Sequence, residues 1–294
     1  DVVVLGSSRA SFGFSPTAID RCLGEVLDRE TRTVNLSRVY STPLSWSNLA
    51  ETLLVGDRIP EVLVIGIAAE AFNEAHHRNY MLYGLESSLD DVPAMLGSAQ
   101  GASEVAASLA PVFRGVENLG LLVSGRFDKE ERLRWLMLHQ GGGQFCVGSS
   151  ACVEQNQAFS DLSAYRWRKF LETRDGAIRA ERFERYEVGS GIYHDNMQQL
   201  LDWAARNDTR ILFVNMPLHP LFERQIPETV VARYSSYVLD LVDRYDQLDL
   251  FDANRGSWRN DEDYFLDPDH LGSAASIEFS EWTCSRIAPL LVGN

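Results

Sequence analysis

The sequence predicts a three-layer α/β/α fold, in which helices cover both faces of a parallel β-sheet. Short apolar runs recur along the chain and are too brief and too uniform for amphipathic helices, as is typical of strands buried on both faces. Stretches with apolar residues at helical spacing separate them. The 294 residues, 45% of them hydrophobic, suffice for one large domain with a substantial core.

The first strand and the residues after it organise the prediction. Residues 2–5 form a β-branched apolar run that Gly6 ends, and residues 7–9 are expected to form a turn. Ser15 and Pro16 are typical of a helix N-cap followed by proline in the first helical turn. A serine is therefore presented at the carboxyl end of a central strand, the edge at which open α/β sheets bind ligands.

The remaining elements follow in order. Further strands are predicted at residues 33–36, 61–66, 210–214 and 248–251. Helices are predicted from Pro16 to about Asp28 and over residues 44–54, 194–207 and 229–244, with a final helix capped by Ser273. We expect a flavodoxin-like sheet with strand order 2-1-3-4-5.

A long block separates the third and fourth strands. The pattern loosens from about 84 to 190, with several helical stretches, and the block is too long for a simple crossover. We predict one domain over residues 1–294 with a mostly helical insertion at about 84–190, which serves as a cap over the site.

Charge and hydropathy exclude two classes of function. The formal net charge is −15, whereas binding to nucleic-acid phosphates needs a basic surface. No apolar run approaches the roughly 18 residues of a membrane-spanning helix.

Both ends of the chain carry residues suited to nucleophilic catalysis. A serine hydroxyl needs a histidine to accept its proton and a carboxylate to orient that histidine. Ser8 follows the first strand, and Asp267 and His270 lie in a loop before the last helix. His219 is the rival base, ranked lower because it lacks a carboxylate at comparable spacing.

Three segments resemble a known family. Gly-Ser-Ser-Arg at 6–9, Asp-x-x-His at 267–270 and Val-Asn-Met-Pro-Leu-His-Pro at 214–220 resemble the SGNH (GDSL-like) hydrolases. The likeness is strongest to a bacterial branch similar to the D-alanyl transfer protein of lipoteichoic acid synthesis and to other envelope proteins. It implies that Ser8 is the nucleophile, His270 the general base and Asp267 its orienting carboxylate.

The resemblance also implies surroundings for the reaction. It implies an extracytoplasmic domain with an N-terminal anchor before Asp1, a small ester or acylated polysaccharide as substrate, and a membrane-anchored acyl-transfer partner. No metal or organic cofactor is required.

Candidate oxyanion donors depart from the family pattern. The family has a glycine after the second strand, but no glycine lies between Gly24 and Gly56, so the amide of Ser37 or Ser41 is the candidate. Asn73 and the Ser8 amide are the other expected donors, although Asn73 also fits an ordinary turn residue.

Arg9 has several interpretations. One is that it binds an anionic group of the substrate, and another is that it pairs with a carboxylate such as Asp267. The third is an ion pair at the surface, which would contribute little to stability. Glu70 with His76 and His77 suggests a metal site, but exposed polar residues lining a loop fit better.

The four cysteines leave the compartment open. The helices that carry Cys22 and Cys284 are expected to be neighbours, where a disulfide and two buried thiols fit equally well. Cys146 and Cys152 flank a short loop and could form a disulfide across it in an oxidising compartment.

The function predicted from these residues is serine-dependent cleavage or transfer of an ester-linked acyl group on an envelope glycan or a related ester. The alternative is a catalytically silent module of the same fold that binds or scaffolds within a polymer-modifying complex. The missing glycine and the uncertain role of Asn73 favour that alternative.

Overall fold

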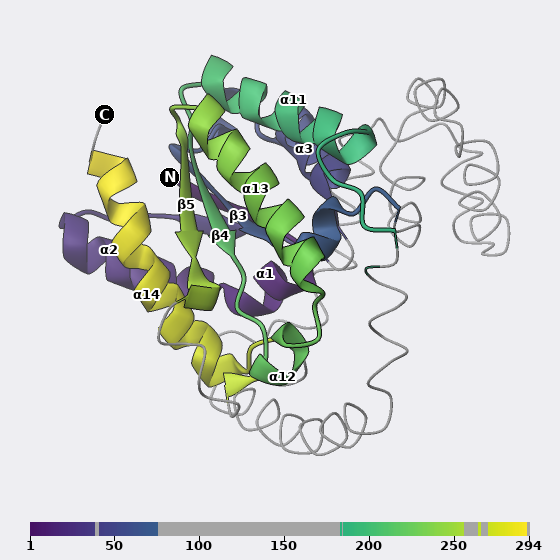
Figure 1. Cartoon of the computed structure of the whole chain (residues 1–294). Helices are drawn as coiled ribbons and strands as arrows, with labels where there is room; N and C mark the ends of the chain where they lie inside the picture. The colour runs from purple at the N-terminus through teal and green to yellow at the C-terminus, as the bar shows by residue number, and fades with distance from the viewer. Residues whose placement is uncertain (39–40, 76–182, 184, 256–263, 266–269, 293–294) are drawn as a thin grey trace, which may run out of the picture.

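The protein is built on a five-stranded parallel sheet. A computed structural model describes residues 1–38, 41–75, 183, 185–255, 264–265 and 270–292 (Figure 1). All strand pairs in the sheet are parallel, and their order is β2-β1-β3-β4-β5, as predicted. The strands are β1 (Val2–Gly6), β2 (Thr33–Asn35), β3 (Val62–Ile67), β4 (Arg210–Asn215) and β5 (Leu248–Asp252).

Helices lie on both sides of the sheet, which confirms the three-layer class. They are α1 (Ser8–Gly13), α2 (Pro16–Leu27), α3 (Pro43–Leu53), α11 (Ile192–Arg206), α12 (Pro220–Glu223), α13 (Glu228–Arg244) and α14 (Ser273–Val292). Short 3-10 turns follow α3, β3 and β5 at η1 (Gly56–Arg58), η2 (Ala69–Phe72) and η5 (Ala253–Arg255). The helices predicted outside the block at 84–190 are all present, and the helical stretches predicted around residues 102–109, 129–138 and 162–173 lie outside the described residues.

Alternate residues of the strands divide the core into two layers. Val3, Leu63 and Phe213 pack against α3, α11 and α13 on one face. Val4 and Val64, with their partners, pack against α1, α2 and α14 on the other face. Figure 1 shows these two helical layers around the sheet. Burial on both faces explains why the strands read as uniform apolar runs.

The predicted turn at residues 7–9 is wrong. Ser7 is extended and Ser8 begins α1, so the segment is a short helix from its second residue. Its six residues are too few to show a hydrophobic period in the sequence. The next boundary is confirmed: Ser15 Oγ accepts a hydrogen bond from the Ala18 amide and Pro16 opens α2.

The helices at the two ends of the chain pack against each other. Cys22 of α2 and Cys284 of α14 form a disulfide, with their Cα atoms 6.3 Å apart. In the same seam, the Ser15 amide donates to Ser280 Oγ at 2.8 Å. Of the two alternatives for these cysteines, the structure therefore has the disulfide.

Several predictions lie largely or wholly outside the described residues. These are Asp267, the pair His76 and His77, Cys146 and Cys152, and most of the insertion predicted at 84–190. Among the helices that the structure does describe, none combines the length and the apolar character needed to cross a membrane.

Candidate active site

Two side chains from opposite ends of the chain meet at the carboxyl edge of the sheet. Ser8 Oγ lies 2.8 Å from His270 Nε2, although 262 residues separate them. Both residues are half-buried. The Phe12 ring of α1 packs against the imidazole, with ring centroids 4.9 Å apart. When Nε2 carries no proton it accepts a hydrogen bond from the Ser8 hydroxyl, which is the contact that activates a serine.

Two glycines let α1 approach the strands that carry it. Gly6 has a φ of +148°, and a Cβ there would stand 2.4 Å from the Ala10 Cβ and 2.9 Å from the Gly66 carbonyl. A Cβ on Gly66 would stand 2.5 Å from the same Ala10 Cβ. Since Gly6 and Gly66 are register partners in neighbouring strands, α1 lies across the ends of β1 and β3. Ser8 is therefore set at the centre of the sheet edge.

His270 is placed by the residues around the start of α14. The Gly272 amide donates to the Tyr264 carbonyl at 2.8 Å, and Phe265 and Leu271 form an antiparallel bridge. His219 packs edge-on against Phe265, with ring centroids 5.5 Å apart. The imidazole in contact with Ser8 is thus that of His270, the histidine ranked first.

Ser41 and Asn73, two of the residues expected to bind the oxyanion, are both buried and hydrogen-bonded. Ser41 Oγ donates to the Gly6 carbonyl and accepts from Trp46 Nε1 at 2.9 Å, while the Ser41 amide donates to the Arg38 carbonyl. Ser41 therefore supports the end of β1, at the residue that precedes the Ser7 N-cap of α1. Its part in oxyanion binding stays a prediction.

Asn73 connects two distant parts of the chain. Its Oδ1 accepts from the amides of Ala75 and Glu187, at 3.2 and 3.0 Å, and the side chain is only 1% exposed. Through these two hydrogen bonds, Asn73 joins the segment after η2 to the segment before α11. Its predicted donation to an oxyanion stays a prediction.

Arg9 is buried and forms an ion pair with Glu70. Arg9 Nη1 donates to Glu70 Oε2 at 2.9 Å and Nη2 donates to Oε1, a two-bond pair between α1 and η2. The side chains are 5% and 17% exposed. The interpretations of Arg9 as a surface ion pair and of Glu70 as an exposed loop residue are therefore wrong, because both side chains are largely buried where α1 meets η2.

Two buried tyrosines, Tyr186 and Tyr234, lie near this ion pair. Tyr186 donates its hydroxyl to the Ala69 carbonyl at 3.2 Å, and Tyr234 donates to Asn215 Oδ1 at 3.0 Å. Burial, followed by the nearby Glu70 carboxylate, raises the pKa of Tyr186. Burial is also the main reason that the pKa of Tyr234 is raised. Both phenols therefore remain neutral donors at neutral pH.

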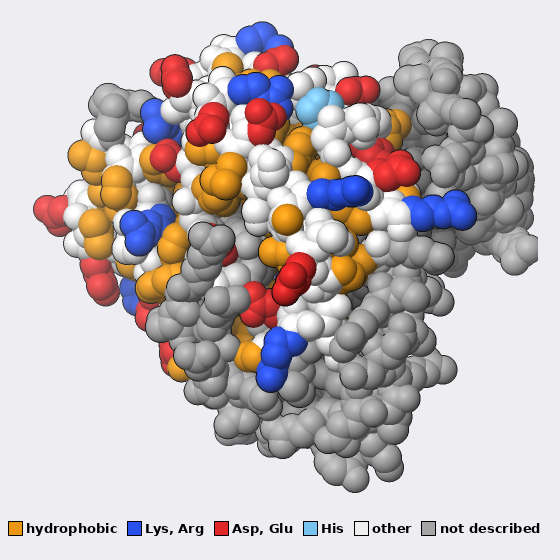
Figure 2. Space-filling model, viewed as in Figure 1, with side chains coloured by type: hydrophobic (Ala, Val, Ile, Leu, Met, Phe, Trp, Pro, Cys, Tyr) orange, Lys and Arg blue, Asp and Glu red, His pale blue; other side chains and the backbone are white. Residues whose placement is uncertain are grey.

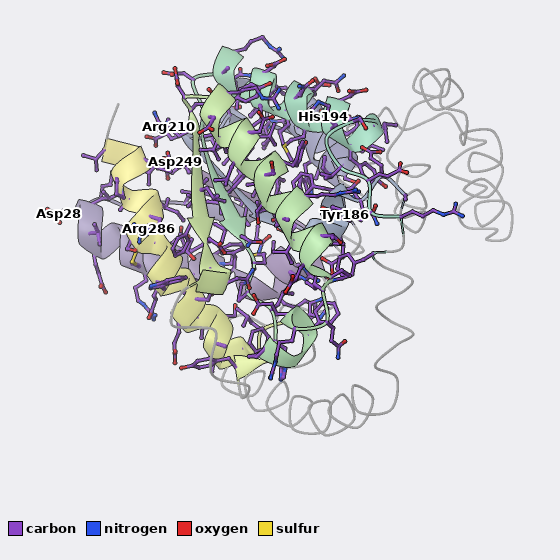
Figure 3. The ribbon with its side chains drawn as sticks, viewed as in Figure 1. Asp28, Tyr186, His194, Arg210, Asp249 and Arg286 are labelled. Atoms are coloured by element: carbon purple, nitrogen blue, oxygen red, sulfur yellow. A yellow bond between two sulfur atoms is a disulfide. The ribbon has the colours of Figure 1, made fainter. Side chains whose placement is uncertain are left out.

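Glu74 caps the first turn of α11. Its Oε1 accepts from the amides of Tyr193 and His194, at 2.6 and 3.1 Å, at the start of α11. Burial raises the pKa of Glu74 to about 7, although these hydrogen bonds lower it. The neighbouring His194 Nδ1 lies 3.2 Å from the Tyr237 hydroxyl. Figure 3 places His194 at one end of α11, with Tyr186 below it.

The described part of the chain offers no candidate metal site. There, no group of three or more His, Cys, Asp or Glu side chains is arranged to hold a metal ion. On the face shown in Figure 2, acidic and basic side chains are interspersed with hydrophobic ones.

Comparison with known proteins gives no match for this chain, either to a protein-family model or to a curated protein.

Proposed function

We propose that the protein is a serine-dependent esterase or acyltransferase that cleaves or transfers an ester-linked acyl group. The observation that supports this most is the 2.8 Å contact between Ser8 Oγ and His270 Nε2 at the carboxyl edge of a parallel sheet. The proposed substrate class, an acylated envelope glycan or a related ester, comes from the resemblance of the Gly-Ser-Ser-Arg and Asp-x-x-His segments to SGNH hydrolases.

The proposed reaction has two halves. Ser8 Oγ attacks the acyl carbon while His270 takes the hydroxyl proton, and the proton then passes to the departing alkoxide as the ester bond breaks. Water or an acceptor hydroxyl next attacks the acyl-serine, His270 removes its proton, and that proton returns to Ser8. Asp267 is proposed to orient the imidazole, and the Ser8 amide with the Asn73 side chain to bind the oxyanion.

The disulfide supports an extracytoplasmic location. Disulfides persist mainly in oxidising compartments, and Cys22 and Cys284 are bonded. We therefore propose a periplasmic or cell-surface location. The N-terminal anchor and the membrane-anchored acyl-transfer partner are proposed from the resemblance to the SGNH hydrolases alone.

The alternative is a catalytically silent binding or scaffolding module. The observation that favours it is the engagement of Asn73 Oδ1 by two backbone amides, which commits one end of this side chain to structure. A silent module would keep the Ser8 and His270 contact without turning over an ester.

Labelling with a fluorophosphonate probe and turnover of p-nitrophenyl acetate test the proposal. We expect Ser8→Ala to abolish labelling and His270→Ala to slow both reactions by roughly a thousandfold or more, since nucleophile and base act as a unit. Ser7→Ala is the matched control, because the Ser7 side chain makes no capping hydrogen bond in α1. His219→Ala tests the rival base.

The outcomes separate the two functions. Equal labelling and turnover in the wild type and Ser8→Ala contradict the enzyme and leave the silent module. Loss of activity in His219→Ala with full activity in His270→Ala contradicts the assignment of the base.

A further inference from the structure

A buried ion pair lies directly beside the proposed nucleophile. Arg9 follows Ser8 in α1, and its guanidinium meets the Glu70 carboxylate through two parallel bonds. Such a two-bond pair fixes both distance and orientation, because the guanidinium and the carboxylate are planar. It therefore restrains the rotation of α1 about its own axis.

The pair joins the ends of the two strands that flank the site. Arg9 comes shortly after β1, and Glu70 belongs to η2, shortly after β3. The glycine contacts hold the underside of α1 against these strands, with Ala10 between Gly6 and Gly66. The ion pair holds the side chain of Arg9, the residue before Ala10. The first turn of α1 is therefore held both by the strands beneath Ala10 and by η2 through Arg9.

Because the Arg9–Glu70 pair is buried, removing either charge destabilises the one that remains. Tyr186 and Tyr234 lie close by, and Phe72 packs on Tyr234 with ring centroids 5.9 Å apart. In such surroundings a charge that loses its partner is strongly destabilised, so the remaining side chain must move toward water. Movement of Arg9 displaces Ser8, the residue next to it.

We propose that Glu70, acting through Arg9, is a positioning residue that keeps Ser8 Oγ in reach of His270 Nε2. This inference rests on the proposed function and adds a residue to it. Neither Arg9 nor Glu70 then needs to touch the substrate.

The first test is the rate of fluorophosphonate labelling, measured well below the unfolding temperature of each variant. We expect Glu70→Gln and Arg9→Gln each to slow labelling by about tenfold or more, since small displacements of reacting groups carry large rate penalties. The matched control is Asp249→Asn, which breaks the more exposed Arg210–Asp249 pair on the same sheet. Figure 3 labels that pair, which lies near the amino ends of β4 and β5. We expect the control to label within about twofold of the wild type.

A second readout does not depend on turnover. The titration of His270, followed by NMR, reports its contact with Ser8. If the pair acts only through charge, Glu70→Gln and Arg9→Gln shift the midpoint in opposite directions, because they remove opposite charges. If the pair positions Ser8, both variants shift it in the direction that Ser8→Ala does.

Each outcome decides the inference. Slower labelling with same-direction shifts supports it. Unchanged labelling in both variants, with full dependence on Ser8, overturns it and leaves the proposed function intact. If Ser8→Ala labels like the wild type, the proposed function fails. In that case the positioning role is judged by NMR alone, and it is overturned if the two variants shift the His270 titration midpoint in opposite directions or not at all. Where a single variant does not fold, the double variant Arg9→Gln with Glu70→Gln, which leaves no unpaired charge, is used and is expected to show the same slow labelling.

Discussion

At the scale of single residues, the candidate site depends on the absence of side chains as much as on their presence. Ser8 reaches His270 only because α1 lies across the ends of β1 and β3. That approach requires Gly6 and Gly66, whose added Cβ atoms would both meet the Ala10 side chain. Close packing of this kind is sensitive to a single methyl group.

Gly66→Ala tests this packing. A Cβ at this position would lie 2.5 Å from Ala10 Cβ and 3.1 Å from Met216 Sδ, so we expect a loss of about 1–3 kcal/mol in the free energy of unfolding and slower labelling of Ser8. Urea unfolding measures the first and fluorophosphonate the second.

Gly24→Ala provides the control for that prediction. Gly24 lies inside α2, and its nearest neighbour would be the Arg29 carbonyl at an ordinary 3.6 Å. We expect a gain of about 0.5–1 kcal/mol there, because alanine favours a helix. A Gly66→Ala protein as stable and as reactive as the wild type would contradict the packing argument.

At the scale of elements, Glu74 stabilises the start of α11 from outside the helix. The first amides of a helix lack partners within it, and Glu74 Oε1 accepts two of them. Gly191, which precedes α11, has a φ of +95° and no side chain in the way of this carboxyl group. The amide of Glu74 also donates to the Glu187 carbonyl, so the segments before and after residues 76–182 are joined here.

Burial of the Glu74 carboxyl group makes stability depend on pH. Burial raises the pKa of Glu74 to about 7, so the folded protein holds this proton more tightly than the unfolded chain. The stability from Glu74 is therefore fully present below the unfolded value and is lost as pH rises through about 7. Relative to Glu74→Gln, which does not titrate, we expect the wild type to lose up to about 3 kcal/mol between pH 4.5 and 8.

Urea unfolding of both proteins across that pH range measures the difference. Glu61→Gln serves as the control, since Glu61 pairs with Arg29 at the surface. Parallel stability curves for the wild type and Glu74→Gln would rule out a titrating cap.

At the scale of the whole molecule, the two ends of the chain are joined both at the candidate site and by a disulfide. The same separation of 262 residues divides Ser8 from His270 and Cys22 from Cys284. The disulfide holds α2 against α14, and these helices follow the segments that carry Ser8 and His270. A covalent bond across so long a loop restricts the unfolded chain strongly.

Replacing both cysteines, as Cys22→Ser with Cys284→Ser, tests this constraint. We expect a loss of about 2–5 kcal/mol in guanidinium unfolding. Arg21→Gln, which breaks the exposed Arg21–Glu281 ion pair on the same two helices, is the control and should cost at most about 1 kcal/mol. A double variant as stable as Arg21→Gln would show that the seam does not depend on the disulfide.

The sequence by itself determined the positions of the strands and most helices. Uniform apolar runs such as residues 62–65 and the Ser15-Pro16 start of α2 are local signals, because burial on two faces and helix capping involve neighbouring residues. Ser8 and His270 could be selected as partners because their chemistry is complementary.

Only the tertiary structure decided how distant groups meet. The Arg9–Glu70 pair, the Cys22–Cys284 disulfide and the acceptor role of Asn73 all depend on contacts between segments far apart in the chain. No spacing in the sequence records such contacts. Packing of the sheet edge brings these groups together, and that packing is a property of the whole fold.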